Sequence, residues 1–438
     1  MDRAGAAGAP CPNAGAAAQK KKRAKIRIGK IVGGGTELMS GGSNHNCAEG
    51  KGRGNVQASS AKLATAAGRP TREVVSHLYV HIPFCARICP YCAFYKERAD
   101  STQTQRFCEA LLRELDEQAA RLPILPETIF FGGGTPTALS TAQLELLLSG
   151  FRDFLDLSAM REWTVEANPG SISRRKAALL RDMGVNRISL GVQSWDDALL
   201  KVLGREHDSA QADVSYHILR DAGFTNVSID LMFGLPGQTL AQWEATLEKT
   251  LALRPTHIST YCLTYEEDTE FFARQACGEY REDPDSDARF LESAMRMLGN
   301  AGFEHYEISN YAREGYASLH NCGYWAGDDY VGIGPSAFST IGLARYQNTP
   351  NYRDYTDRIF AGTSTVTSTE VLTPEMKRAE RIALSLRTGR GIPSAELSSW
   401  PEERREFEGL GLLREVNGNL VLTPRGKLLA DAVAEAFV

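Results

Sequence analysis

The chain has 438 residues, which is long enough for two or three domains, and its 42% hydrophobic and 24% charged residues are typical of a globular protein. A net charge of −5 gives no overall attraction to nucleic acid, and no apolar run approaches the roughly 18–20 residues of a membrane-spanning helix. We therefore expect no nucleic-acid partner and no membrane span. Nine cysteines, an odd number, argue against a disulfide framework and for a reducing compartment.

The first 70 residues differ in composition from the rest of the chain. They are rich in Gly, Ala, Ser and Asn, and they include the basic run Lys20–Arg27. Such a composition cannot bury a core, so we expect residues 1–70 to be a disordered, low-complexity extension. The extension is either a solvated tail or a transit peptide. The expected location is the cytoplasm, with the mitochondrial matrix as the alternative.

From residue 71 to residue 302, short β-rich runs alternate with helix-length amphipathic patterns. Strands are predicted at residues 76–82, 128–131, 162–167, 187–192, 226–231 and 256–263. Helices are predicted at residues 102–121, 141–154, 173–183, 209–222, 240–252 and 285–301. Six β-then-α units indicate a parallel sheet with right-handed crossovers, and six is fewer than the eight of a closed barrel. The predicted fold class is therefore α/β, a partial (β/α)6 barrel with its chemistry at the carboxyl ends of the strands.

Cys85, Cys89 and Cys92 form a C-x3-C-x2-C motif on a loop directly after the first predicted strand. Thiolates are soft ligands that suit iron–sulfur clusters and zinc. Three thiolates can hold three irons of a [4Fe-4S] cubane, which leaves the fourth iron open to S-adenosylmethionine (SAM). The alternatives are a zinc site with His81 as the fourth ligand, or three unrelated buried cysteines.

Polar or glycine-rich motifs follow the next four predicted strands. Residues 132–137 (GGGTPT) expose backbone N–H groups, although such a run can serve only the bend. Glu166 can bind an ammonium or ribose hydroxyls, or can cap a helix. Gln193 and Arg205 offer hydrogen bonds to a polar ligand or a carboxylate, and a surface salt bridge is the alternative for Arg205. Asp230 ends the fifth strand, and five such motifs in register indicate one polar cofactor site.

Residues 76–438 resemble the branch of the radical SAM superfamily that contains oxygen-independent coproporphyrinogen III oxidase. The motifs that carry the resemblance are YxHxPFCxxxCxYC, GGGTPT, ExNPG, RxSxGVQS, LGRxH and DLMxGLPGQT. Within that branch the chain is similar to the HemW-type haem chaperones, because Phe94 stands where the oxidase has a further cysteine. The resemblance implies a radical SAM barrel whose cluster is held by Cys85, Cys89 and Cys92. The SAM contacts that it implies fall on Tyr79, Gly133, Gly134, Thr135, Glu166, Gln193, Arg205, Asp230 and Tyr91, the last at a position where the oxidase has an aromatic residue near a second SAM.

Residues 303–370 are the predicted connecting region, which begins with a strand over residues 303–311 and contains the motif HNxxYW. The resemblance associates this motif with haem. A histidine such as His320 ligates haem iron, and Tyr and Trp side chains can flank a porphyrin face. The alternative is a capping segment packed on the barrel, in which the side chain of His320 is hydrogen-bonded to the backbone. Several relatives carry a histidine near position 338, where this chain has Phe338.

The C-terminal segment, residues 371–438, is predicted to be a winged-helix-like α+β domain. A helix begins at Pro374, residues 410–423 are typical of a hairpin with a turn at Gly418, and a last helix covers residues 424–437. Winged helices often bind DNA, but the mixed charge and the lack of a basic stripe favour a lid or a partner-docking domain.

These patterns and the resemblance together predict a haem chaperone that binds haem and delivers it to haem proteins such as respiratory enzymes. An electron donor such as flavodoxin or ferredoxin is the expected partner of the cluster. The alternative function is that of an oxygen-independent coproporphyrinogen III oxidase, a radical oxidative decarboxylase of porphyrin biosynthesis. Phe94 and the HNxxYW motif favour the chaperone.

Overall fold

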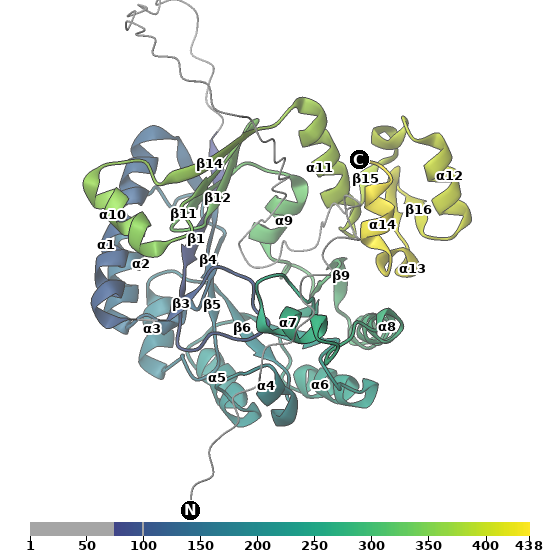
Figure 1. Ribbon diagram of the computed structural model, residues 1–438, viewed down its shortest axis with the longest axis horizontal. Helices are drawn as coiled ribbons and strands as arrows, with labels where there is room; N and C mark the ends of the chain where they lie inside the picture. Colours follow the sequence, from purple (N-terminus) through teal and green to yellow (C-terminus); the bar gives the residue numbers. More distant parts are fainter. Residues whose placement is uncertain (1–73, 99) are drawn as a thin grey trace, which may run out of the picture.

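The computed structural model describes residues 74–98 and 100–438, so the predictions for residues 1–70 lie outside the described chain. Six β/α units form the centre of the molecule (Figure 1). Their strands are β1 (Val75–Ile82), β4 (Ile124–Gly133), β5 (Glu162–Ala167), β6 (Arg187–Gln193), β7 (Asn226–Phe233) and β8 (His257–Cys262). Their helices are α1 (Ser101–Arg121), α2 (Thr141–Phe154), α3 (Arg174–Asp182), α5 (Ser209–Asp221), α6 (Leu240–Ala252) and α8 (Pro284–Asn300). The six predicted strands and the six predicted helices are confirmed.

One mixed sheet of twelve strands runs through the molecule, with β1, β4, β5, β6, β7 and β8 as parallel neighbours in that order. Residues 303–370 add strands at both of its edges. Beyond β1 lie β11 (Tyr330–Ile333), which is parallel to β1, and then the antiparallel strands β12 (Phe338–Ile341), β13 (Ala344–Asn348) and β14 (Val366–Val371). Beyond β8 lie the antiparallel strands β10 (Asn310–Ala312) and β9 (Glu304–Glu307). The single strand expected over residues 303–311 was therefore wrong, because the chain reverses direction between β9 and β10.

The long helices pack their apolar faces against the sheet. In α1, Phe107, Leu111 and Leu115 lie on one face and are fully buried. Capping boxes satisfy the first backbone N–H groups of α2, α5 and α6. The sequence patterns did not indicate the edge strands β11–β14. Other elements that they missed include β2 (Phe84–Cys85), β3 (Glu97–Arg98), α4 (Asp197–Val202), α7 (Glu270–Ala276), α9 (Leu319–Ala326), α10 (Tyr352–Ala361) and the 3-10 turns η1 (Pro136–Ala138) and η2 (Ser394–Leu397).

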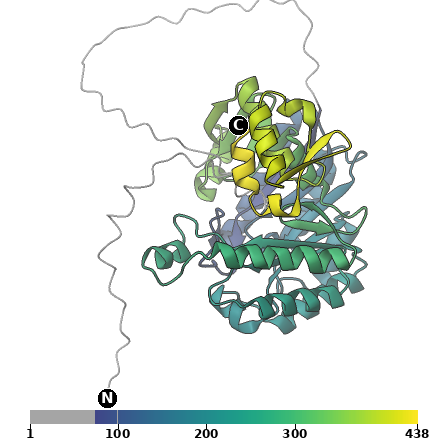
Figure 2. The same cartoon turned by 90° about the vertical axis from the view of Figure 1, so that its right-hand side faces the viewer.

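The C-terminal segment lies against one side of the barrel and has its own hydrophobic cluster (Figure 2). It contains α11 (Pro374–Leu386), β15 (Ile392–Pro393), α12 (Pro401–Gly409), β16 (Leu413–Val416), β17 (Asn419–Leu422), α13 (Pro424–Lys427) and α14 (Ala430–Glu435). The predicted hairpin is the β16–β17 pair of a three-stranded antiparallel sheet. The predicted last helix is divided in two, because the backbone at Leu429 is not helical (φ −123°, ψ 26°).

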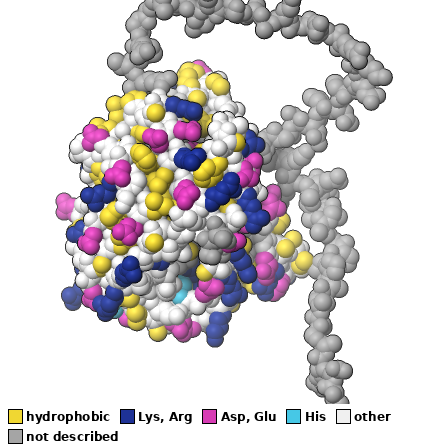
Figure 3. Space-filling view, turned by 90° about the vertical axis from the view of Figure 1, so that its left-hand side faces the viewer, with side chains coloured by type: hydrophobic (Ala, Val, Ile, Leu, Met, Phe, Trp, Pro, Cys, Tyr) yellow, Lys and Arg dark blue, Asp and Glu magenta, His cyan; other side chains and the backbone are white. Residues whose placement is uncertain are grey.

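Charges of both signs are mixed on the surface. On the face shown in Figure 3, Lys and Arg side chains are interspersed with Asp and Glu side chains. None of the helices in the described ranges combines the length and the apolar character that crossing a membrane requires.

Candidate cofactor site at the carboxyl ends of the strands

The loop that carries the three cysteines is hydrogen-bonded to the glycine-rich turn at the carboxyl end of β4. The backbone N–H of Gly134 donates to Ile82 O at 2.8 Å, and the N–H of Thr135 donates to Phe84 O at 2.8 Å. These bonds fix Cys85, the last residue of β2, directly beside the glycine-rich turn.

The glycines of the GGGTPT run are required by this close packing. Gly133 has a φ of +102°, and a Cβ atom there would lie 2.5 Å from the ring of His81. A Cβ atom on Gly134 would lie 2.6 Å from the carbonyl carbon of Pro83. Only glycine allows the two loops to approach so closely.

A circuit of polar contacts joins two of the cysteines to the ends of β4 and β5. Thr135 Oγ1 lies 3.6 Å from Cys85 Sγ and accepts a hydrogen bond of 2.8 Å from Asn168 Nδ2. Asn168 Oδ1 in turn accepts a hydrogen bond of 2.6 Å from Arg205 Nη2. Arg205 leads back to the cysteine loop, because its Nη1 lies 3.6 Å from Cys89 Sγ. We call these five residues the cysteine circuit.

Arg205 also binds the end of β6. Its Nη2 donates to Gly191 O at 2.9 Å, whereas its buried Nε has no hydrogen-bond partner among the described residues. A Cβ atom on Gly191 would lie 2.8 Å from Gln193 Nε2 and 3.1 Å from Asn168 Oδ1. The missing side chain of Gly191 therefore lets Asn168, Gln193 and Arg205 meet at one point.

His81 is engaged on both ring nitrogens, which argues against the zinc alternative. Its Nδ1 lies 3.0 Å from the hydroxyl of Tyr79, and its Nε2 lies 2.9 Å from the carbonyl oxygen of Tyr95. Burial lowers the pKa of His81 to about 4, although the hydrogen bond to Tyr95 opposes this shift. Within residues 74–98 and 100–438, no three His, Cys, Asp or Glu side chains are placed to hold one metal ion. A cubane does not need such convergence, because each thiolate binds a different iron.

Two buried carboxyl groups, Glu166 on β5 and Asp230 on β7, interact electrostatically inside the barrel. Glu166 Oε2 accepts the backbone N–H of Gly133 at 3.2 Å, and burial together with the negative charge of Asp230 raises the pKa of Glu166 to about 8. Asp230 accepts hydrogen bonds from three serine hydroxyls, at 2.6 Å from Ser189, 2.7 Å from Ser228 and 2.8 Å from Ser259. Burial raises the pKa of Asp230, and these three hydroxyls oppose the shift.

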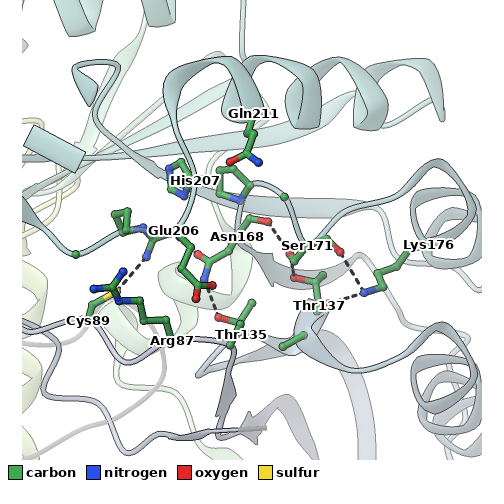
Figure 4. Close-up of a pocket in the computed structure, with 16 residues that line it drawn as sticks. Arg87, Cys89, Thr135, Thr137, Asn168, Ser171, Lys176, Glu206, His207 and Gln211 are labelled. Carbon is green, nitrogen blue, oxygen red and sulfur yellow. Dashed lines mark hydrogen bonds between the residues drawn. The ribbon is translucent and has the colours of Figure 1, made fainter. Parts of the chain in front are cut away.

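A cavity of about 500 Å³ opens beside the cysteine circuit (Figure 4). Cys89, Thr135, Asn168 and Arg205 lie on its wall, and Lys176 of α3 faces it from the other end. The Nζ of Lys176 donates to two backbone carbonyl oxygens, those of residues 137 and 171. Of these groups, Asn168 and Lys176 were not among the predicted site residues. The ExNPG motif contains Asn168, but nothing in the sequence pattern indicated that Lys176 would reach the same cavity.

Tyr91 lies at the edge of this polar group of residues, where burial raises the pKa of its phenol and the neighbouring Arg205 guanidinium opposes the shift. It belongs to an apolar cluster beneath α7, where its ring centroid is 6.0 Å from that of Phe271. The backbone N–H of Phe271 donates to Pro90 O at 3.1 Å, which joins α7 to the cysteine loop.

His320 lies at the opposite end of the barrel from the cysteines. Its Nδ1 is 2.7 Å from Thr128 Oγ1, and Thr128 precedes Gly133 by five residues on β4, a distance of roughly 16 Å along the strand. The side chain is 1% exposed and stacks on Phe130, with 5.1 Å between the ring centroids. The backbone N–H of His320 donates to Glu162 at 3.1 Å, and Nε2 has no partner among the described residues. Burial places the pKa of His320 well below its ordinary value, so the imidazole is neutral.

Comparison with known proteins places the chain in a family. A family model described as the radical SAM superfamily matches residues 79–250. The protein of Lactococcus lactis called heme chaperone HemW is 37% identical over 370 residues, which are 82% of this chain and 96% of that relative. This chain belongs to the HemW family of radical SAM proteins. The HemW protein of Bacillus subtilis is 36% identical over 82% of this chain and 98% of its own length.

Two further matches are a mitochondrial protein and a solved structure. The mitochondrial radical S-adenosyl methionine domain-containing protein 1 of Danio rerio is 36% identical over 61% of each chain. The structure of the coproporphyrinogen III oxidase HemN from Escherichia coli covers 84% of this chain and 90% of its own, with a TM-score of 0.72 and 24% identity. This match concerns the fold and confirms the predicted α/β radical SAM architecture. Membership of the superfamily also implies a [4Fe-4S] cluster and SAM.

Proposed function

We propose that Cys85, Cys89 and Cys92 hold a [4Fe-4S] cluster whose fourth iron binds SAM. The cysteine circuit supports this assignment, because Thr135 and Arg205 reach the sulfur atoms of Cys85 and Cys89. A hydroxyl and a guanidinium at this position would stabilise thiolates that carry the negative charge of a cluster. When bound, the cluster supplies an electron to SAM, and we propose flavodoxin or ferredoxin as its donor.

We further propose that SAM lies between the cluster and the ends of β4–β7. The polar groups that meet over Gly191 support this location, since Arg205 and Gln193 can bind the carboxylate and ammonium ends of an amino acid. Glu166 and Asp230 provide carboxylates for cationic or hydroxyl groups. The remaining proposed contacts are Tyr79, Gly133, Gly134, Thr135 and Tyr91, which lies between Arg205 and α7.

We propose that the protein is a haem chaperone, which binds haem and delivers it to haem proteins such as respiratory enzymes. The observation that carries this proposal is the similarity to HemW relatives along 96% and 98% of their lengths. The unpartnered Nε2 of His320 supports α9 as the haem segment, because a neutral imidazole nitrogen is the usual haem ligand. Since His320 is 1% exposed, α9 must move to admit haem. The C-terminal segment, with its own hydrophobic cluster, would serve as a lid or a docking domain for the acceptor.

Haem titration of anaerobically reconstituted protein tests this function. We expect the wild-type chain to give a Soret band that elutes with the protein, and His320→Ala to retain less haem. His217→Ala is the matched control, because His217 is exposed on α5, where it forms a surface ion pair with Asp213. Equal haem retention in the two variants would move the haem site away from α9. Release of carbon dioxide from coproporphyrinogen III, with SAM and a reductant, would instead support the oxidase.

We propose that the protein is located in the cytoplasm. The odd number of cysteines in the sequence and the C-x3-C-x2-C motif support a reducing compartment. The mitochondrial matrix is the second candidate, supported by the name of the relative from Danio rerio.

A further inference from the structure

A continuous chain of hydrogen bonds runs through the interior of the barrel from Asp230 to the start of α9. Ser228 Oγ lies 2.7 Å from Asp230 Oδ1 and 2.8 Å from His257 Nδ1. His257 Nε2 lies 2.8 Å from the hydroxyl of Tyr306. That hydroxyl accepts the backbone N–H of Ser318, the N-cap residue of α9, at 3.3 Å. We call these five residues the donor chain.

All groups of the donor chain have hydrogen-bond partners only if every group donates its proton toward Asp230. The backbone N–H of Ser318 can only donate, so the Tyr306 oxygen accepts there and its own proton is free to go to His257 Nε2. His257 then carries its proton on Nδ1 and donates it to Ser228 Oγ. Ser228 donates in turn to Asp230. Every proton therefore points toward the carboxylate, which is the arrangement that an ionised Asp230 requires.

We propose that Tyr306 and His257 are positioning residues that hold Asp230 ionised and oriented in the SAM site, and so connect that site to the N-terminus of α9. This inference rests on the proposed role of Asp230 in binding SAM. It concerns the protein's own residues and can be tested with or without the ligand.

The charges around Asp230 show why such support is needed. Burial favours the neutral acid, and the carboxyl group of Glu166 on β5 adds negative charge beside it. Arg187 on β6 is the cation that favours the ionised form, and the buried phenol of Tyr261 on β8 faces the same carboxylate. His257 itself is held neutral by burial and by Arg187, so it acts as a hydrogen-bond donor and not as a cation.

Removal of the Tyr306 hydroxyl would remove the group that fixes the direction of the donor chain, without touching the SAM site. In Tyr306→Phe, Nε2 of His257 loses its donor and is left buried as an unpaired acceptor. The Tyr306 proton then no longer fixes the tautomer of the imidazole, and in the tautomer protonated at Nε2, Ser228 donates to His257 Nδ1. Asp230 loses one of its three hydroxyl donors, so its ionised form becomes less favourable.

Equilibrium binding of SAM to the reconstituted, cluster-containing protein, measured from pH 6 to pH 9, provides the first test. We expect Tyr306→Phe to weaken SAM binding about tenfold near neutral pH, which is the effect of one lost charge-assisted hydrogen bond. At higher pH, where Asp230 ionises again, part of the SAM affinity should return. Tyr216→Phe is the matched control, because its buried ring also loses one hydroxyl, which donates to Leu253 O at 3.1 Å outside the donor chain. Identical SAM affinity and pH profile in the two variants would overturn the inference and leave the proposed SAM site standing.

Isotope-edited infrared spectroscopy of Asp230 provides the second test and does not depend on SAM. Protein labelled with 13C-aspartate is titrated, and the band lost in Asp230→Asn identifies the carboxyl group. We expect the ionisation midpoint to rise by about one pH unit in Tyr306→Phe and to stay unchanged in Tyr216→Phe. Ser228→Ala removes the last donor directly and gives the same test if Tyr306→Phe does not fold. An unshifted ionisation midpoint of Asp230 in the folded variant would contradict the role of Tyr306 and His257. A shifted midpoint in a protein that binds no SAM would contradict only the proposed SAM site.

Discussion

At the scale of single residues, Arg205 holds the site together. One guanidinium contacts Cys89 Sγ, Asn168 Oδ1 and Gly191 O, and so joins the cysteine loop to the ends of β5 and β6. A planar fork with several N–H donors can make these contacts at once, whereas an ammonium group cannot.

Arg205→Lys keeps the positive charge but removes the planar guanidinium, so it tests whether the geometry of that group matters. We expect the variant to fold, to lose iron faster under a chelator and to bind SAM about tenfold more weakly, because the fork contacts to Asn168 and Gly191 are lost. Iron release and SAM binding measured side by side check both effects. Arg174→Lys is the control, since Arg174 is exposed and forms only an ion pair with Asp221 at 3.0 Å. Unchanged SAM affinity in Arg205→Lys would remove Arg205 from the site.

The sequence indicated the charged and amide residues at the strand ends, but not the contacts among them. Arg205 and Gln193 were predicted as independent ligand groups, and the structure brings both against Asn168 over Gly191. This contact depends on the register between β5 and β6 and on a missing side chain, which are three-dimensional properties. Lys176 could not be predicted for the same reason, because the packing of α3 decides which groups its Nζ contacts.

At the scale of elements, the turn after β4 and the cysteine loop form one unit. Gly134 packs against the backbone between Pro83 and Phe84, with which no side chain is compatible. Backbone atoms cannot rotate aside as a flexible side chain can, so added volume at this position must separate the two loops.

Gly134→Ala should therefore reduce cluster binding more than it reduces the stability of the fold. We expect a loss of about 1–3 kcal/mol in the free energy of unfolding and a larger loss of bound iron, because the contact lies beside Cys85. Urea unfolding and iron content give the two readouts. Gly299→Ala is the control, since its Cβ atom on α8 meets nothing within 4 Å and should stabilise the helix. Equal iron content in the two variants would show that the turn does not position the cysteine loop.

The regular elements were predictable because their patterns are long. Buried parallel strands are continuous apolar runs, and the six long helices repeat their apolar residues on one face. The edge strands β9–β14 and the helix α9 are short and rich in polar residues, so no local period reveals them. Their pairing is decided by the edges that β1 and β8 leave open.

At the scale of the whole molecule, Glu114 joins the helical layer to the added edge of the sheet. Its carboxyl group lies on α1 and accepts hydrogen bonds from Gly334 N at 2.8 Å, Asn348 Nδ2 at 2.7 Å and the Tyr355 hydroxyl at 2.6 Å. Burial raises the pKa of Glu114 to about 7, although these three donors oppose the shift. In the sequence it appears as one polar residue between the core positions of a helix, so its role could not be predicted.

This raised pKa predicts a pH dependence of stability. Between the ordinary value of 4.5 and about 7, the folded state keeps a proton that the unfolded chain has released, so the contribution of Glu114 to stability falls as pH rises. Glu114→Gln cannot titrate, and we expect its destabilisation relative to wild type to be about 2 kcal/mol smaller at pH 7 than at pH 5. Urea unfolding of both proteins at the two pH values measures the difference. A gap that stays constant or widens toward pH 7 would show that Glu114 titrates normally.

The central claim is a cubane held by three cysteines with one iron left for SAM. Mössbauer spectroscopy of anaerobically reconstituted protein, recorded before and after SAM is added, tests it most directly. We predict a [4Fe-4S] spectrum in which one iron of four changes when SAM binds, and no cluster in a folded Cys89→Ser variant, with Cys277→Ser at an exposed position as the control. A protein without a cluster, or with four irons that do not respond to SAM, would contradict the account.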